Sequence, residues 1–244
     1  MHISFFEEFP TPKNLQKLQL VTWPTKLYLA APSFKEFTRI KADIKNKKIS
    51  SIIYWPILQK KEGYWISPFS ERKSLVRIFK ELEGKNVPVM LDLELPTTQN
   101  PSLYFTQGLN CIRNKRLIKK FIQQYPGEIY GAEYYPFKRW LSWWGLHYSH
   151  PNIKVIKMLY HSMHHFSDDF LGKHLQEGKQ RYGKNFIVGY GTIAQGITGR
   201  EKILTPEQLE NDLRIAQQNG IQEIVIFRLG GLNKEYAKRI QRYV

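Results

Sequence analysis

The stretch VPVMLDLELP, from Val87 to Pro96, decides which fold the sequence predicts. Apolar and β-branched residues lead directly into Asp92 and Glu94, one leucine separates the two acids, and a proline closes the segment. Such a short apolar run predicts a buried strand from Val87 to Leu95. Because side chains alternate along a strand, we expect both carboxylates on one face, about 6 to 7 Å apart. Two carboxylates on an otherwise apolar strand are costly to bury, which indicates a function for the pair.

Seven other short apolar or aromatic runs occur along the chain, and each is followed by a helix-like segment. They are His2 to Phe6, Lys26 to Ala31, Ser50 to Pro56, Ile129 to Tyr135, Val155 to His161, Phe186 to Thr192, and Glu223 to Leu229. Strands that alternate with helices indicate a parallel sheet, and eight such units predict a (β/α)8 TIM barrel, an α/β fold, over residues 1–244 as a single domain. An open doubly wound sheet normally has a glycine-rich turn after its first strand, and FFEEFPTP has no glycine.

Helix start signals fall where the loops after the strands would place them. Ser33 with Glu36, and Thr205 with Gln208, have the spacing of a capping box, and a proline follows Thr205 directly. These signals support the alternation of strands and helices.

Composition limits the class of protein. The formal net charge is +16, from 37 Lys and Arg against 21 Asp and Glu, which favours an anionic ligand or surface. The lysines are spread over nearly every helix-like segment, so nucleic acid is not the expected main partner. The single cysteine, Cys111, excludes an internal disulfide, and we expect neither a membrane span nor a signal peptide. The expected location is cytoplasmic.

Polar and aromatic residues stand at the ends of the predicted strands, where barrel enzymes collect their active sites. The candidate site residues are Glu7, Trp55, Asp92, Glu94, Glu133, Tyr135, Tyr160, His161, Tyr190 and Arg228. Carboxylates beside aromatic rings are typical of a site that cleaves glycosidic bonds, since one acid protonates the leaving oxygen and rings stack on sugars. We expect a carbohydrate substrate, Glu94 as proton donor with Asp92 beside it, and no metal or cofactor. Glu133 remains open as nucleophile, base or ligand of sugar hydroxyls.

Two strand ends resemble family 18 glycoside hydrolases, the chitinases and their relatives. The D-x-E at Asp92 and Glu94 is similar to the end of their D-x-x-D-x-D-x-E motif, and Met158-Leu159-Tyr160 resembles their M-x-Y. The resemblance implies Glu94 as acid/base, Asp92 as the residue that orients the substrate N-acetyl group, and Tyr160 as a ligand of that group. The D-x-E also resembles that of family 25 lysozymes.

Three other functions remain open. The glycine-rich loops after the last two strands, with Lys157 as a Schiff-base lysine, would suit a phosphosugar enzyme such as an aldolase or isomerase. A run of potential metal ligands would suit a metal hydrolase: His161, His164, His165, Asp168 and Asp169. A barrel without catalysis could bind carbohydrate through Trp140, Trp143 and Trp144, which could equally contact a membrane interface or pack a helix.

Overall fold

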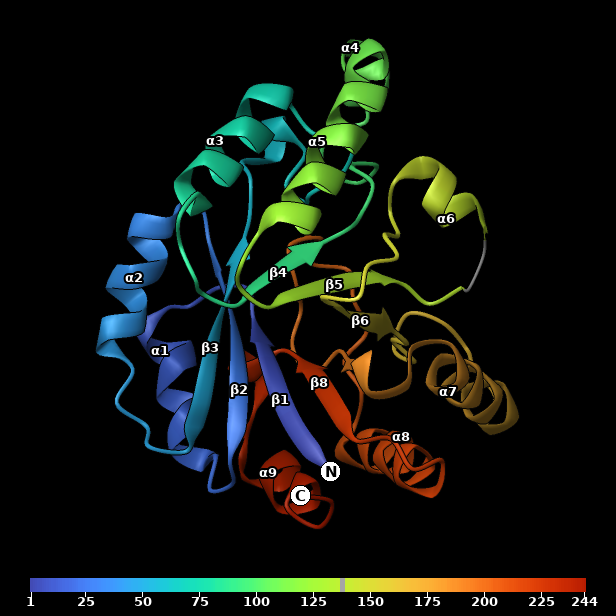
Figure 1. Ribbon diagram of the computed structural model, residues 1–244. Coiled ribbons are helices and arrows are strands. Elements are labelled where there is room, and N and C mark those ends of the chain that lie inside the picture. The colour runs from blue at the N-terminus through green and yellow to red at the C-terminus, as the bar shows by residue number, and fades with distance from the viewer. Residues whose placement is uncertain (137–138) are drawn as a thin grey trace. The chain divides into compact units, whose positions relative to one another are not determined.

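Eight parallel strands form the centre of the computed structural model, which describes residues 1–136 and 139–244 (Figure 1). They hydrogen-bond in chain order and β8 pairs with β1, so the barrel is closed. The strands are β1 His2–Glu7, β2 Thr25–Ala31, β3 Ile49–Pro56, β4 Val89–Asp92, β5 Ile129–Tyr134, β6 Ile153–Met158, β7 Phe186–Gly191 and β8 Glu223–Phe227. This confirms the predicted (β/α)8 barrel.

Helices follow the strands, as the alternating pattern predicts. The α-helices are α1 Pro12–Leu15, α2 Phe34–Asp43, α3 Arg72–Leu82, α4 Leu103–Thr106, α5 Cys111–Gln124, α6 Arg139–Trp144, α7 Asp168–Tyr182, α8 Pro206–Gln218 and α9 Lys234–Ile240. Short 3₁₀ helices are η1 Gln16–Leu20, η2 Lys60–Glu62, η3 Gly108–Asn110, η4 Gly183–Asn185 and η5 Leu229–Gly231. Residues 137 and 138, which precede the predicted tryptophan cluster of Trp140, Trp143 and Trp144, lie outside the described residues.

The predicted capping residues hold two of these helices. At the start of α8, the Thr205 hydroxyl accepts from the Gln208 N–H at 3.3 Å, and the Gln208 side chain accepts from the Thr205 N–H at 2.9 Å. Before α2, the Ser33 hydroxyl accepts from the Glu36 N–H at 3.2 Å. The Glu36 carboxylate, however, binds the Arg39 guanidinium one turn further on at 2.6 Å.

Strand β4 is shorter than the predicted run to Leu95. Its ladder with β5 stops at Leu93, whose N–H still donates to the Ala132 carbonyl at 2.8 Å. The Leu95 N–H donates instead to the hydroxyl of Tyr134 at 3.4 Å. A side chain thus takes the place of a backbone carbonyl, and Glu94 lies just beyond the strand.

Strands β5 to β8 also end earlier than predicted. Tyr135, Tyr160, His161 and Arg228 therefore lie in the loops that follow their strands. Two non-proline peptide bonds at these ends are cis, Gly191–Thr192 and Phe227–Arg228.

The residues of the barrel fall into two compact units. The first, here the β1/β8 unit, consists of Met1–Leu29, Ala42–Ile52 and Ile156–Val244. The second, here the β4/β5 unit, consists of Ala30–Lys41 and Ile53–Val155. Among the helices of the described residues, none is long and apolar enough to cross a membrane.

Candidate functional site

In the β4/β5 unit, strand register decides which side chains point into the barrel. The pairing of β4 with β5 places Asp92 and Tyr134 on one face. Tyr54 of β3 pairs with Val89, which lies on the opposite face of β4 from Asp92. The Tyr54 ring packs against Phe37 of α2 with 4.9 Å between centroids, so its face is the outer one that the helices cover. Asp92 and Tyr134 therefore belong to the inner face.

Two carboxylates act on the phenol of Tyr134. Burial raises the pKa of Tyr134 far above its usual value, and the negative charges of Glu94 and Asp92 raise it further. The phenol therefore keeps its proton, and its oxygen accepts from the Leu95 N–H at 3.4 Å. Asp92 is 4% exposed and Glu94 is half-buried, so the deeper acid lies within the strand and the shallower one at its rim. Together they form an acid pair with a neutral donor beside it.

Glu133 lies on the other face of β5, because it neighbours Tyr134 in the strand. Its carboxylate is 2.8 Å and 3.1 Å from Nδ1 of His147, and the residue is 1% exposed. The structure thus does not bring Glu133 to the face of Asp92, and a histidine already holds it. Tyr135, the next residue after β5, is half-buried.

The tryptophans of this unit differ in exposure. Trp55 follows Tyr54 and therefore points inward, but it is only 3% exposed, which leaves little ring surface for a sugar. On α6, Trp144 packs against Phe69 with 5.3 Å between centroids, as a helix-packing residue does. Trp143 is 72% exposed and Trp140 39%.

In the β1/β8 unit, Glu7 and Arg228 come together at 3.2 Å. Glu7 is fully buried and also accepts from the N–H groups of Phe9 and Gly230 and from the Asn14 amide. Burial raises the pKa of Glu7, while the Arg228 charge and these donors oppose the rise. The Glu7 carboxylate, which the sequence predicts to bind substrate, is therefore already hydrogen-bonded by other groups of the protein.

His161 contacts an acid, Asp212, that was absent from the predicted site, and Tyr190 lies within range of its charge. Nδ1 of His161 is 3.0 Å from Oδ1 of Asp212, a fully buried residue of α8. Tyr190 is fully buried and lies close enough for the Asp212 charge to add to the effect of burial, which raises the pKa of the tyrosine well above its usual value. Burial raises the pKa of Asp212 itself to about 6. This cluster lies toward α8, on the helical side of the strands.

Tyr160 and Lys157 point in different directions. The Tyr160 ring lies 5.9 Å from that of Phe227 at the end of β8. Lys157 is 2% exposed, and its charge contributes to the lowered pKa of His174 on α7, chiefly an effect of burial. Lys157 therefore faces the helical layer.

The histidine run after β6 borders a small cavity. A volume of about 200 Å³ lies between this loop and the loop after β7, and both His164 and His165 line it with Arg200 and Lys202. Within residues 1–136 and 139–244, no group of three or more His, Cys, Asp and Glu side chains could hold a metal ion.

Three residues of these arrangements were absent from the predicted site: Tyr134, His147 and Asp212. Asp212 left a signal, because it occupies the apolar stripe of its helix with Leu209, Leu213 and Ala216. That Tyr134 shares a face with Asp92 follows only from the register of β4 and β5. His147 lies in a loop, and no pattern in the sequence points to it.

Solved structures of known proteins have a fold similar to this one. No family model matches the chain, and no curated protein matches its sequence. A GH18 chitinase from Pseudoalteromonas aurantia is 11% identical, with a TM-score of 0.57 and all of both chains covered. The PgaB (BpsB) glycoside hydrolase domain from Bordetella bronchiseptica is 10% identical, with a TM-score of 0.56 over 98% of this chain and 97% of that one. A xylose isomerase domain protein from Planctomyces limnophilus is 9% identical, with a TM-score of 0.56 over 99% and 94%. These likenesses show a shared barrel fold.

Proposed function

We propose that this barrel is a glycoside hydrolase in which Glu94 is the general acid and Asp92 its partner. The observation that carries the proposal is the acid pair at the end of β4, with both charges acting on the inward phenol of Tyr134. The fold neighbours support a carbohydrate substrate, since they include a chitinase and a glycoside hydrolase domain.

The proposed reaction uses the different depths of the two acids. Like charges side by side disfavour ionisation of both acids, and the proposed reaction requires Glu94 to hold the proton while Asp92 is ionised. Glu94 gives this proton to the glycosidic oxygen as the bond from that oxygen to the anomeric carbon breaks, and Asp92 stabilises the positive charge on the sugar. Water then attacks the anomeric carbon and returns a proton to Glu94. The protonated Tyr134 phenol adds no further negative charge beside the two acids.

The other predicted residues take lesser roles. Glu133 acts as a positioning residue for the loop of His147. Tyr135, just past β5, is the proposed contact to sugar hydroxyls. Arg228 and Glu7 stabilise the loop after β8.

The phosphosugar alternative has less support. The Gly230 N–H donates to Glu7 at 2.7 Å, and the Gly231 N–H donates to the Arg228 carbonyl at 3.1 Å. A phosphate would have to displace both partners. Lys157, the lysine that a Schiff base would need, lies toward α7.

The test measures new reducing ends on a panel of N-acetylated and plain oligosaccharides, for the wild type, Glu94→Gln and Glu83→Gln. Glu83 is an exposed acid at the end of α3, so its variant controls for the loss of one carboxylate. We expect turnover on at least one member, a loss of about a thousandfold or more in Glu94→Gln, and no change in Glu83→Gln. Retained turnover in a folded Glu94→Gln protein refutes the assignment. A wild type that binds an oligosaccharide without cleaving it favours the non-catalytic carbohydrate-binding barrel.

A further inference from the structure

Three large apolar side chains project from the segment between β4 and the body of α5. Leu109 is 96% exposed, Phe105 90% and Ile112 64%. They come from η3, α4 and the first turn of α5, which follow one another directly along the chain (Figure 1). We call these three residues the apolar tip. Adjacent exposed apolar residues on a folded protein mark a contact surface.

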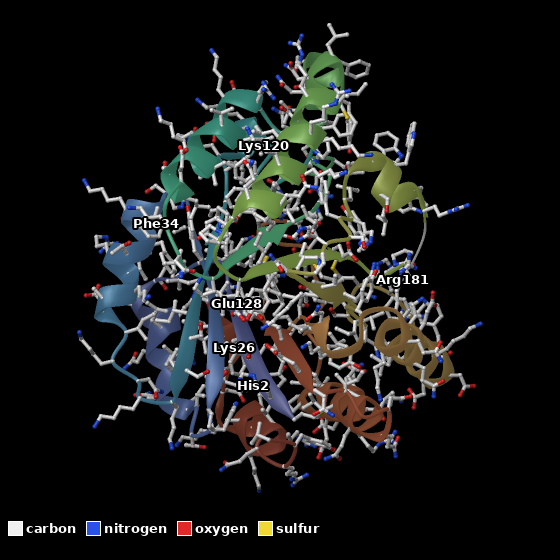
Figure 2. The ribbon with its side chains drawn as sticks, viewed as in Figure 1. His2, Lys26, Phe34, Lys120, Glu128 and Arg181 are labelled. Atoms are coloured by element: carbon white, nitrogen blue, oxygen red, sulfur yellow. The ribbon has the colours of Figure 1, made fainter. Side chains whose placement is uncertain are left out.

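The apolar tip is joined to a helix that carries only positive charge. No Asp or Glu occurs in residues 95–127. The cations of α5 are Arg113, Lys115, Arg116, Lys119 and Lys120, and all except the half-buried Lys115 are exposed. Figure 2 labels Lys120 on this helix. The buried face of α5 is formed by Asn114, Ile118 and Ile122, so the cations lie on its outer side.

An exposed tryptophan belongs to the same surface. Nζ of Lys115 donates to the carbonyl of Trp143 at 2.9 Å, which ties the end of α6 to the start of α5. The Trp143 ring is 72% exposed. Tryptophan favours the boundary between lipid headgroups and hydrocarbon, because its ring is apolar and its N–H needs a polar partner.

We propose that the apolar tip and the basic face of α5 bind the surface of an anionic phospholipid bilayer. Shallow insertion of Phe105, Leu109 and Ile112 removes their apolar area from water, and the arginines and lysines behind them meet the lipid phosphates. Neither contribution is large alone, and interfacial binding commonly combines the two.

Two other occupants fit the surface less well. In a symmetric dimer each basic helix would face its own copy, and like charges would oppose the contact. A sugar would stack on Phe105 or Trp143, but Leu109 and Ile112 have no ring for stacking. Only an apolar layer with anionic groups above it uses both the aliphatic side chains and the cations.

The test is co-sedimentation of the full chain with vesicles. Vesicles of phosphatidylcholine alone are compared with vesicles that also contain about 30% phosphatidylglycerol. We expect the protein to bind the anionic vesicles at least about tenfold more strongly, to detach at high salt, and to show a blue shift of tryptophan fluorescence on binding. Equal binding to both kinds of vesicle, or none to either, refutes the proposal.

Variants locate the contact. Phe105→Ser with Leu109→Ser removes two side chains that the fold barely covers, and we expect binding to fall about tenfold or more. Its control is Ile203→Ser, at an apolar residue 53% exposed in the loop after β7. Lys119→Glu is compared in the same way with Lys47→Glu, an exposed lysine before β3. Equal losses in variant and control place the contact elsewhere. A dimer that Phe105→Ser with Leu109→Ser dissociates, seen by sedimentation velocity, would make the apolar tip a self-interface and overturn the proposal.

Discussion

Nδ1 of His147 lies 2.8 Å from Oε2 of Glu133, on the face of β5 that points away from Asp92. The Glu133 side chain is buried, at 2% exposure, and that of His147 is 10% exposed. We predict that His147→Ala lowers the free energy of unfolding by about 2 to 4 kcal/mol, because a buried carboxylate loses its donor. Glu133→Gln keeps an acceptor for the imidazole and should cost less. Urea unfolding measures both effects.

Turnover of the same variants separates a positioning role from a catalytic one. Folded Glu133→Gln protein should keep turnover within about tenfold of the wild type, whereas Glu94→Gln should lose about a thousandfold or more. If Glu133→Gln is as inactive as Glu94→Gln while fully stable, Glu133 is a catalytic residue and the proposed pair is incomplete.

Tyr134→Phe removes one hydroxyl and keeps the ring. Since this hydroxyl is the neutral donor beside Glu94 and Asp92, we predict a fall in kcat of about ten- to hundredfold with KM little changed. The control is Tyr125→Phe, whose hydroxyl donates to the Val87 carbonyl at 2.8 Å on the same unit. Equal activity losses in the two variants would show that Tyr134 acts through stability alone.

The alternation of apolar runs with helix signals is enough to predict the barrel, but it does not show which side chains of each strand point inward. An error of one or two residues in the bounds of a strand does not change the number or order of the strands and helices, so it does not change the predicted fold. The face to which a side chain points depends on the strand register, and a shift of one residue reverses that face. Glu133 and Tyr134 are adjacent, yet only the pairing of Asp92 with Ala132 shows that Tyr134, and not Glu133, shares the face of Asp92.

Long-range partners were the second limit. Glu7 looked available because its strand ends there, but three of its partners, Arg228, Gly230 and Asn14, come from other elements. His147 reaches Glu133 from a loop. A sequence read alone shows where a polar residue stands in its own element, not which distant group satisfies it.

The four donors around Glu7 predict a structural role for this acid. Glu7→Ala would remove the shared acceptor of the Arg228 guanidinium and the Gly230 N–H, so we expect a loss of about 3 kcal/mol in the free energy of unfolding. Glu7→Gln keeps one acceptor oxygen and should lose less. Thermal unfolding ranks the two. If instead both variants are as stable as the wild type and bind an oligosaccharide more weakly, Glu7 is the substrate ligand that the sequence indicated.

Asp212 gives the fold a predictable dependence on pH. Its folded pKa is about 6 against an ordinary value of 3.8, chiefly because it is buried, so the folded state favours the protonated acid. The stabilisation is fully present below about pH 4 and is lost as pH rises through 6, by roughly 2 to 3 kcal/mol. Asp212→Asn cannot ionise, and its amide oxygen still accepts from His161. We therefore predict that the variant is more stable than the wild type at pH 8 and that their unfolding free energies converge toward pH 4.

The measurement is urea unfolding from pH 4 to pH 8, with Asp43→Asn as control. Asp43 is an exposed acid at the end of α2, so its variant should follow the wild type over the whole range. Parallel curves for Asp212→Asn and the wild type would mean that Asp212 is already ionised at pH 4, held so by His161. In that case the pair is a buried ion pair, and Asp212→Asn should destabilise the protein at every pH where His161 is charged.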